Sequence, residues 1–164
     1  MADLLLVHPA AASELHKRVH IDALPQRVWR ALIDPAAIAA WTSDEPLEVI
    51  TDWRIGGPIV FRGVLHGRLR FENHGVVEAF EPALRLQYTH YSSLSKRALG
   101  DVPENHVVIE FALTPDGGGT RLDLTLRRLH DEAVRGHMDF HWDMTLPALK
   151  CHCEREDVVA ETIT

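Results

Sequence analysis

Tyr88 and His90 are the polar residues whose spacing best suits a binding or catalytic role. They alternate with Leu84 and Leu86 in the segment ALRLQYTHY, so in a strand all four side chains point to one side. In an apolar cavity, a phenol and an imidazole would orient a ligand carbonyl or hydroxyl, or donate a proton in a cyclase-like reaction. The alternative is that both are core residues whose polar tips reach backbone or water.

Histidines and cysteines of the C-terminal segment have spacings that suggest metal binding. His137 and His141 are one helical turn apart, but no glutamate lies between them as in a zincin motif, and a third ligand would have to come from another element. Cys151 and Cys153 would point about 200° apart on a helix, so their thiols cannot share one ion. We therefore expect no metal and no cofactor.

Three strand carboxylates are candidate general bases: Glu78 and Glu110, which lie in otherwise apolar strand segments, and Asp123, which lies on a polar face. A carboxylate held in a cavity can have a raised pKa and abstract a proton from a carbonyl compound. Glu110, however, is out of phase with the apolar residues Ile109 and Phe111, which indicates that it points away from the cavity. No nucleophile elbow, phosphate loop or dinucleotide fingerprint occurs, which excludes hydrolase, kinase and Rossmann readings.

Composition limits the class of protein further. The chain has 164 residues, 46% of them apolar and 25% charged, and its formal net charge is −7. This length fits one domain, and the acidic balance argues against a nucleic-acid partner. The two cysteines give no disulfide framework, and no apolar run is long enough to span a bilayer. We expect a cytoplasmic protein with no membrane partner.

Hydrophobic periodicity predicts one domain over residues 14–157, between an extension (1–13) and a tail (158–164). A strand over 14–22 is followed by two short helices, each opened by a proline. From Leu47 the period changes to two, which predicts about six strands joined by glycine-rich and Glu-Pro turns, hence an antiparallel sheet.

A long helix is predicted from about Asp131 to Arg155, with a kink at Pro147. One apolar stripe on it should face the sheet: Val134, Met138, Trp142, Thr145, Leu149 and Cys153. A second patch lies on the opposite side: Phe140, Met144, Pro147 and Cys151. Either a second subunit or the N-terminal LLLV segment could cover it.

The order of motifs resembles one known family. Five segments are similar to those of proteins related to the activator of the heat-shock protein 90 ATPase. They are IDALPQRVWRALIDPAAIAAW, the glycine pair before Pro58 with Phe61, GVVEAFEPALRLQYTH, FALTPDGGGTRLDLT and HMDFHWDMTLPALK. That family is a branch of the START-like (SRPBCC) superfamily. The resemblance implies an α+β helix-grip fold: a curved antiparallel sheet of six to seven strands, two short helices after the first strand, and a long C-terminal helix across the concave face.

The resemblance also implies a function. START-like domains bind small hydrophobic molecules between the long helix and the sheet, so we expect such a ligand here, bound without catalysis. The alternatives are a cyclase- or dehydratase-like enzyme acting on a polyketide-like carbonyl compound, and a co-chaperone-like interaction module with a chaperone partner. A homodimer is a further possibility. The residues expected to line the ligand site are Trp29, Trp41, Phe61, Phe71, Tyr88, His90, Phe111, Met138 and Trp142.

Overall fold

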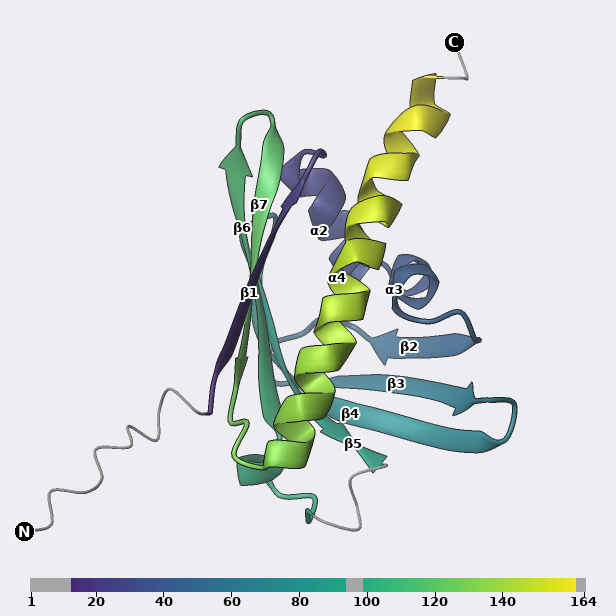
Figure 1. Cartoon of the computed structure of the whole chain (residues 1–164), viewed down its shortest axis with the longest axis vertical. Coiled ribbons are helices and arrows are strands. Elements are labelled where there is room, and N and C mark those ends of the chain that lie inside the picture. The colour runs from purple at the N-terminus through teal and green to yellow at the C-terminus, as the bar shows by residue number, and fades with distance from the viewer. Residues whose placement is uncertain (1–12, 94–98, 162–164) are drawn as a thin grey trace, which may run out of the picture.

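The computed structural model describes residues 13–93 and 99–161, with the side chains of 156–161 excluded. The LLLV segment and nearly all of the predicted 1–13 extension lie outside these residues. Within the described part of the chain, no helix is both long and apolar enough to cross a membrane. The architecture is a single curved sheet with α-helices on its concave side (Figure 1).

The sheet is antiparallel and contains seven strands in the order β1-β7-β6-β5-β4-β3-β2. The first strand therefore pairs with the last, while β2 to β7 follow one another as hairpins, as the predicted turns require. Their bounds are β1 Leu15–Ile21, β2 Leu47–Thr51, β3 Pro58–Leu65, β4 Leu69–Glu81, β5 Arg85–Ser92, β6 Val107–Asp116 and β7 Gly119–Arg127.

The short helices α2 (Pro25–Ile33) and α3 (Pro35–Thr42) each begin at a proline, whose missing N–H costs nothing in the first turn. Asp34 caps α3, because its side chain accepts a hydrogen bond from the Ala37 N–H at 3.3 Å. A 3-10 turn, η2 (Pro103–Asn105), precedes β6. The predicted helical pair and the α+β helix-grip fold are confirmed.

The long helix α4 (Glu132–Glu161) crosses the concave face diagonally (Figure 1). It extends past the predicted end at Arg155, because no glycine or proline follows to stop it. The helix also continues through Pro147, and the kink expected there stays a prediction. Lys17 on β1 fastens α4 to the sheet edge, since its Nζ lies 2.5 Å from Asp139 and 2.6 Å from Asp143.

The core lies between α4, the short helices and the concave face of the sheet. The stripe predicted on α4 is buried at Met138, Trp142, Thr145, Leu149 and Cys153. It packs within a cluster that also contains the inward residues of the strands, among them Ile59, Val77, Leu86, Phe111, Leu122, Leu124 and Leu126. Burial of this many large apolar side chains is the main stabilising contribution to the fold.

β4 and β5 come unusually close at Gly75. A Cβ atom added there would lie 1.7 Å from the carbonyl oxygen of Thr89, so only glycine fits. The register between the same two strands shifts between Val77 and Ala79. Such an irregularity increases the local bend and helps the sheet to curve around α4.

Candidate functional site

The concave face and α4 share a continuous row of aromatic rings, here called the ring chain. Neighbouring centroids along it are separated by 6.4, 5.6, 6.4, 6.1 and 6.4 Å. In order, the ring chain consists of Trp41, Trp142, Phe111, Tyr88, Phe61 and His90. It joins α3, α4, β6, β5 and β3, and all six members belong to the predicted set of ligand-lining residues.

One side chain of the ring chain, Trp142, places a hydrogen-bond donor in the core without an acceptor among the described residues. Trp142 is 4% exposed, and its Nε1 has no hydrogen-bond partner among the described residues. A buried polar group left in this way costs about 1–3 kcal/mol, and native proteins contain few of them. The side chain of Tyr88, two rings along the ring chain, is 7% exposed.

The indole N–H groups of Trp41 and Trp53, in contrast, donate hydrogen bonds to backbone carbonyls. Trp41 Nε1 donates to the Ala31 carbonyl at 2.8 Å, and Trp53 Nε1 donates to the Ile33 carbonyl at 2.9 Å. Both bonds anchor the ring to α2, as is usual for a buried indole. Trp142 departs from this pattern in the middle of the concave side.

Burial controls the protonation of the polar groups in the site. It raises the pKa of Tyr88, so the phenol stays a hydrogen-bond donor at neutral pH. Burial, with a smaller contribution from the charges of His141 and other histidines, lowers the pKa of His90 to about 4. The pKa of His141 is lowered for the same reasons. At neutral pH the lining is therefore polar but uncharged.

The remaining predicted lining residues lie around or beyond the ring chain. Met138 is buried one helical turn before Trp142 on α4. Trp29 instead packs edge-on against Phe80, with centroids 5.1 Å apart, in a separate aromatic group. Phe71 lies over Gly63 near the far end of the β3–β4 hairpin, where a Cβ on the glycine would come within 2.7 Å of its ring.

Of the candidate general bases, Glu110 and Asp123 lie on the outer face of the sheet and are held by arginines, whereas Glu78 accepts a hydrogen bond from Gln87 Nε2 at 2.7 Å. Glu110 accepts hydrogen bonds from Arg85 at 2.7 Å and Arg127 at 3.2 Å. Although burial opposes it, these contacts lower the pKa of Glu110. Asp123 is bound by Arg18 at 2.7 Å, and on balance its pKa is also lowered. Neither carboxylate has the environment of a base with raised pKa.

The metal arrangements considered from sequence do not assemble. His137 and His141 stack with centroids 6.2 Å apart, but among the described residues no third histidine, cysteine or carboxylate joins them. Cys151 is exposed while Cys153 is buried, as expected for residues on opposite sides of a helix.

Two residues of this region were not identified from the sequence as ligand contacts. Asn73 pairs with Phe61 across β3 and β4 and so shares its face; its Oδ1 is buried without a hydrogen-bond partner in the described chain. His141 is half-buried beside Trp142, with ring centroids 5.2 Å apart. The alternation along β4 would place Asn73 on the inner face, but only when the pairing of β4 with β3 is known.

A hollow of about 710 Å³ lies between α3 and α4 on the outside of the molecule. Trp41 and Thr145 form its inner wall, so the hollow reaches the first ring of the ring chain. Thr42 also lines it, and its Oγ1 has no hydrogen-bond partner among the described residues. Met144 and Cys151 form the outer margin.

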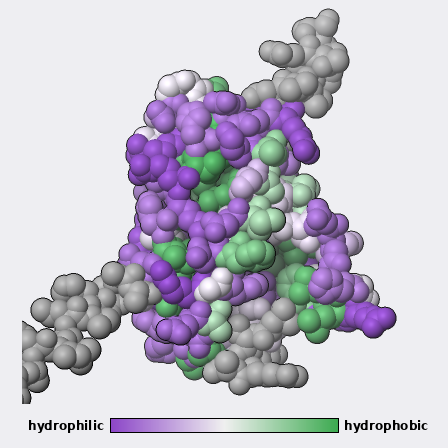
Figure 2. Space-filling view, in the orientation of Figure 1, coloured by the Kyte–Doolittle hydropathy of each residue, from purple (hydrophilic) through white to green (hydrophobic). Residues whose placement is uncertain are grey.

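Beside this hollow, the second apolar patch of α4 is exposed as predicted. Phe140 is 69% and Met144 is 64% exposed, and Pro147 and Cys151 continue the patch. Figure 2 shows hydrophobic residues following the course of α4, with hydrophilic surface on either side. Patches of this kind commonly mark interaction surfaces.

A sheet wrapped around a long C-terminal helix, with an aromatic and polar lining between them, defines a helix-grip domain. A family model described as "Activator of Hsp90 ATPase homolog 1-like protein" matches residues 22–154. The chain therefore belongs to this family, as the sequence motifs suggested. No match was found among curated proteins.

Solved structures of similar proteins have the same fold. A protein from Cytophaga hutchinsonii is 29% identical, with a TM-score of 0.72 over 88% of this chain and 96% of that one. A protein from Rhodobacter sphaeroides is 24% identical, with a TM-score of 0.70 over 87% and 93%. The "Aha1 dimer" from Colwellia psychrerythraea is 21% identical, with a TM-score of 0.68 over 86% and 96%.

Proposed function

We propose that the chain binds a small, mainly apolar molecule between α4 and the concave face of the sheet, and that the ligand carries one hydrogen-bond acceptor. The observation that carries this proposal is the buried donor Trp142 Nε1, which lacks an acceptor among the described residues, together with the Tyr88 phenol two rings along the same ring chain. A carbonyl or ether oxygen of the ligand would accept a hydrogen bond from the Trp142 indole or the Tyr88 hydroxyl. The rings themselves supply the apolar contact.

The energetics favour a ligand of mixed character. Each Å² of apolar ligand surface removed from water contributes about 25 cal/mol. One acceptor oxygen adds selectivity, because a ligand without it leaves the buried indole N–H of Trp142 unsatisfied. A charged ligand is disfavoured, since the lining carries no formal charge when His90 is neutral. The hollow beside Trp41 offers the approach from outside.

A binding role accounts for the lining better than the cyclase alternative. The candidate bases Glu110 and Asp123 face away from the ring chain and are paired with arginines. His90 is the one ionisable side chain of the ring chain that could accept a proton near neutral pH, and its low pKa makes it a weak base. The co-chaperone alternative stays a prediction.

The test uses two probes that differ in a single oxygen function, acetophenone and ethylbenzene. The wild-type chain should bind acetophenone more tightly than ethylbenzene. Tyr88→Phe should weaken acetophenone binding roughly fivefold to tenfold and leave the affinity for ethylbenzene unchanged. Tyr91→Phe is the matched control, because Tyr91 Oη donates to the Leu99 carbonyl at 2.7 Å outside the ring chain. If wild type binds the two probes equally tightly, and Tyr88→Phe does so too, the proposal is contradicted. Water, not a ligand oxygen, would then accept the hydrogen bonds of the donors.

We also infer that the exposed patch on α4 joins two copies of this chain. Phe140 and Met144 lie one turn apart and are both more than half exposed, and a structurally similar protein is described as a dimer. Sedimentation should show a concentration-dependent dimer that is lost when both residues are replaced by serine. A wild-type chain that stays monomeric at the highest concentration would end this inference.

A further inference from the structure

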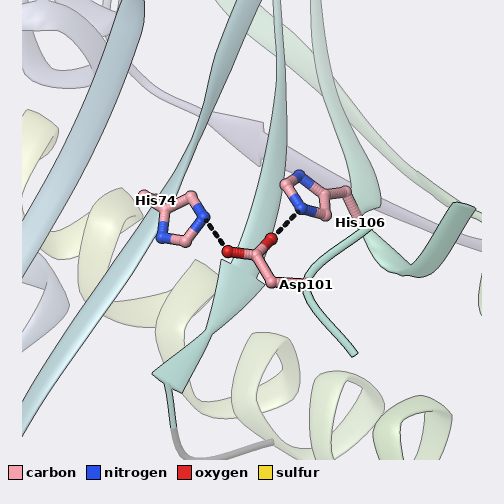
Figure 3. A group of neighbouring side chains, drawn as sticks. All are labelled: His74, Asp101 and His106. Atoms are coloured by element: carbon pink, nitrogen blue, oxygen red, sulfur yellow. Dashed lines mark hydrogen bonds and ion pairs between the residues drawn. The ribbon is translucent and has the colours of Figure 1, made fainter. Parts of the chain in front are cut away.

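A compact group of ionisable side chains lies on the outer face of the sheet, away from the ring chain. His74 comes from β4, Asp101 from the loop after β5, and His106 from the residue preceding β6. Figure 3 shows the carboxylate of Asp101 between the two imidazole rings. His74 Nε2 lies 2.9 Å from Asp101 Oδ2, and His106 Nε2 lies 2.6 Å from Oδ1.

We propose that His74, Asp101 and His106 bind a divalent transition-metal ion, for which Zn²⁺ has the best-matched chemistry. One ligand atom from each residue lies within 4.8 Å of the others, and the three form the one such group found among the described residues. A tetrahedral zinc ion with bonds of about 2.0–2.1 Å separates its ligand atoms by about 3.3–3.5 Å. The ion therefore needs only small side-chain rotations to enter.

The donor set suits the metal chemically. Two imidazoles with one carboxylate are preferred by Zn²⁺ and related ions over Mg²⁺ or Ca²⁺, which favour oxygen ligands. Three protein ligands leave at least one coordination position for water.

The surroundings hold the two imidazoles and the loop in place. The ring of Tyr91 stacks on His106 with centroids 5.3 Å apart and an interplanar angle of 24°, and it also contacts His74 at 5.6 Å. Asn105 Nδ2 donates to the Gly100 carbonyl at 2.9 Å and closes the loop that carries Asp101. Ordered supporting contacts of this kind reduce the cost of positioning metal ligands.

The group is also accessible from solvent. The side chain of His106 is 13% exposed, that of His74 is 35%, and that of Asp101 is 46%. An ion can therefore enter from outside without opening the sheet. Once bound, it would link β4 to the segment that leads into β6.

This proposal does not depend on ligand binding at the ring chain. Only His74 comes from a strand, β4, while Asp101 and His106 come from the segment between β5 and β6, so no short sequence motif marks the site. The sequence-based expectation of no metal considered only His137 with His141 and the two cysteines.

The test is a calorimetric titration of the metal-free, untagged full chain with ZnCl₂. We expect one ion per chain, and roughly a tenfold or larger loss of affinity in both Asp101→Asn and His106→Ala. His137→Ala is the control, because it removes the alternative helical pair and should leave the affinity unchanged. Circular dichroism of each variant checks that it is folded.

Co²⁺ provides a second readout, since its absorption spectrum reports the ligand type. Nitrogen and oxygen ligands give visible bands without the thiolate charge-transfer band that Cys151 or Cys153 would add. The proposal is overturned if both Asp101→Asn and His106→Ala still bind the ion with wild-type affinity. It is also overturned if His137→Ala loses binding, or if the wild-type chain binds no ion. In that case the group is a set of ion pairs that stabilises the loop.

Discussion

Mild acid should destabilise the folded chain through His90. Burial lowers the pKa of His90 from 6.5 to about 4, with a further contribution from the charge of His141. In the unfolded chain the pKa returns to about 6.5, so between about pH 6.5 and 4 the unfolded state binds more protons than the folded state. The folded state therefore loses stability as the pH falls through this window. At about pH 5 these two pKa values correspond to a loss of about 2 kcal/mol, an upper figure because part of the His90 surface remains accessible.

Urea unfolding followed by tryptophan fluorescence, at about pH 7.5 and about pH 5, measures this loss directly. His90→Gln removes the titrating group. Between about pH 7.5 and about pH 5, the free energy of unfolding of this variant should therefore fall by about 2 kcal/mol less than that of wild type. His130→Gln, at an exposed histidine outside the ring chain, should behave like wild type. If wild type and His90→Gln lose equal stability, the reasoning about burial of His90 is refuted.

Two further substitutions test how the sheet is shaped and fastened. Gly75→Ala should lower the free energy of unfolding by more than about 3 kcal/mol, because its Cβ would lie 1.7 Å from the Thr89 carbonyl oxygen. Gly100→Ala is the control, since a Cβ there would have nothing within 4 Å. Equal melting temperatures of the two variants would contradict the close approach of β4 and β5 at Gly75. Lys17→Gln removes the 2.5 Å contact with Asp139 and should cost about 1 kcal/mol at low salt; a loss that does not shrink at high salt would show that the charge is not what matters.

The sequence predicted the orientation of residues within single elements well. Alternation in β5 placed Tyr88 and His90 on one face, where both rings neighbour Phe61 at 6.1 and 6.4 Å, because a strand has a period of two. The helical period likewise placed Met138 and Trp142 in the core and Phe140 outside. Both patterns are local, so they can be recognised without knowing which strands pair.

Features that depend on strand register and curvature were beyond the sequence. Trp29 on α2 packs against Phe80, and Phe71 packs over Gly63 near the β3–β4 turn, so neither ring is a neighbour in the ring chain. The His74–Asp101–His106 group forms only when β4, β5 and β6 pair side by side. The missing hydrogen-bond partner of Trp142 is likewise a property of the packed core.

The indole N–H signal of Trp142 in a nitrogen-15 NMR spectrum tests the central claim most directly. Trp142→Phe assigns this signal, and the indole of Trp53, bonded to the Ile33 carbonyl at 2.9 Å, is the internal control. Saturating acetophenone should move the Trp142 signal to lower field, as a new hydrogen bond requires, while the Trp53 signal stays in place. A Trp142 signal that does not move at saturation would contradict a ligand site between α4 and the sheet.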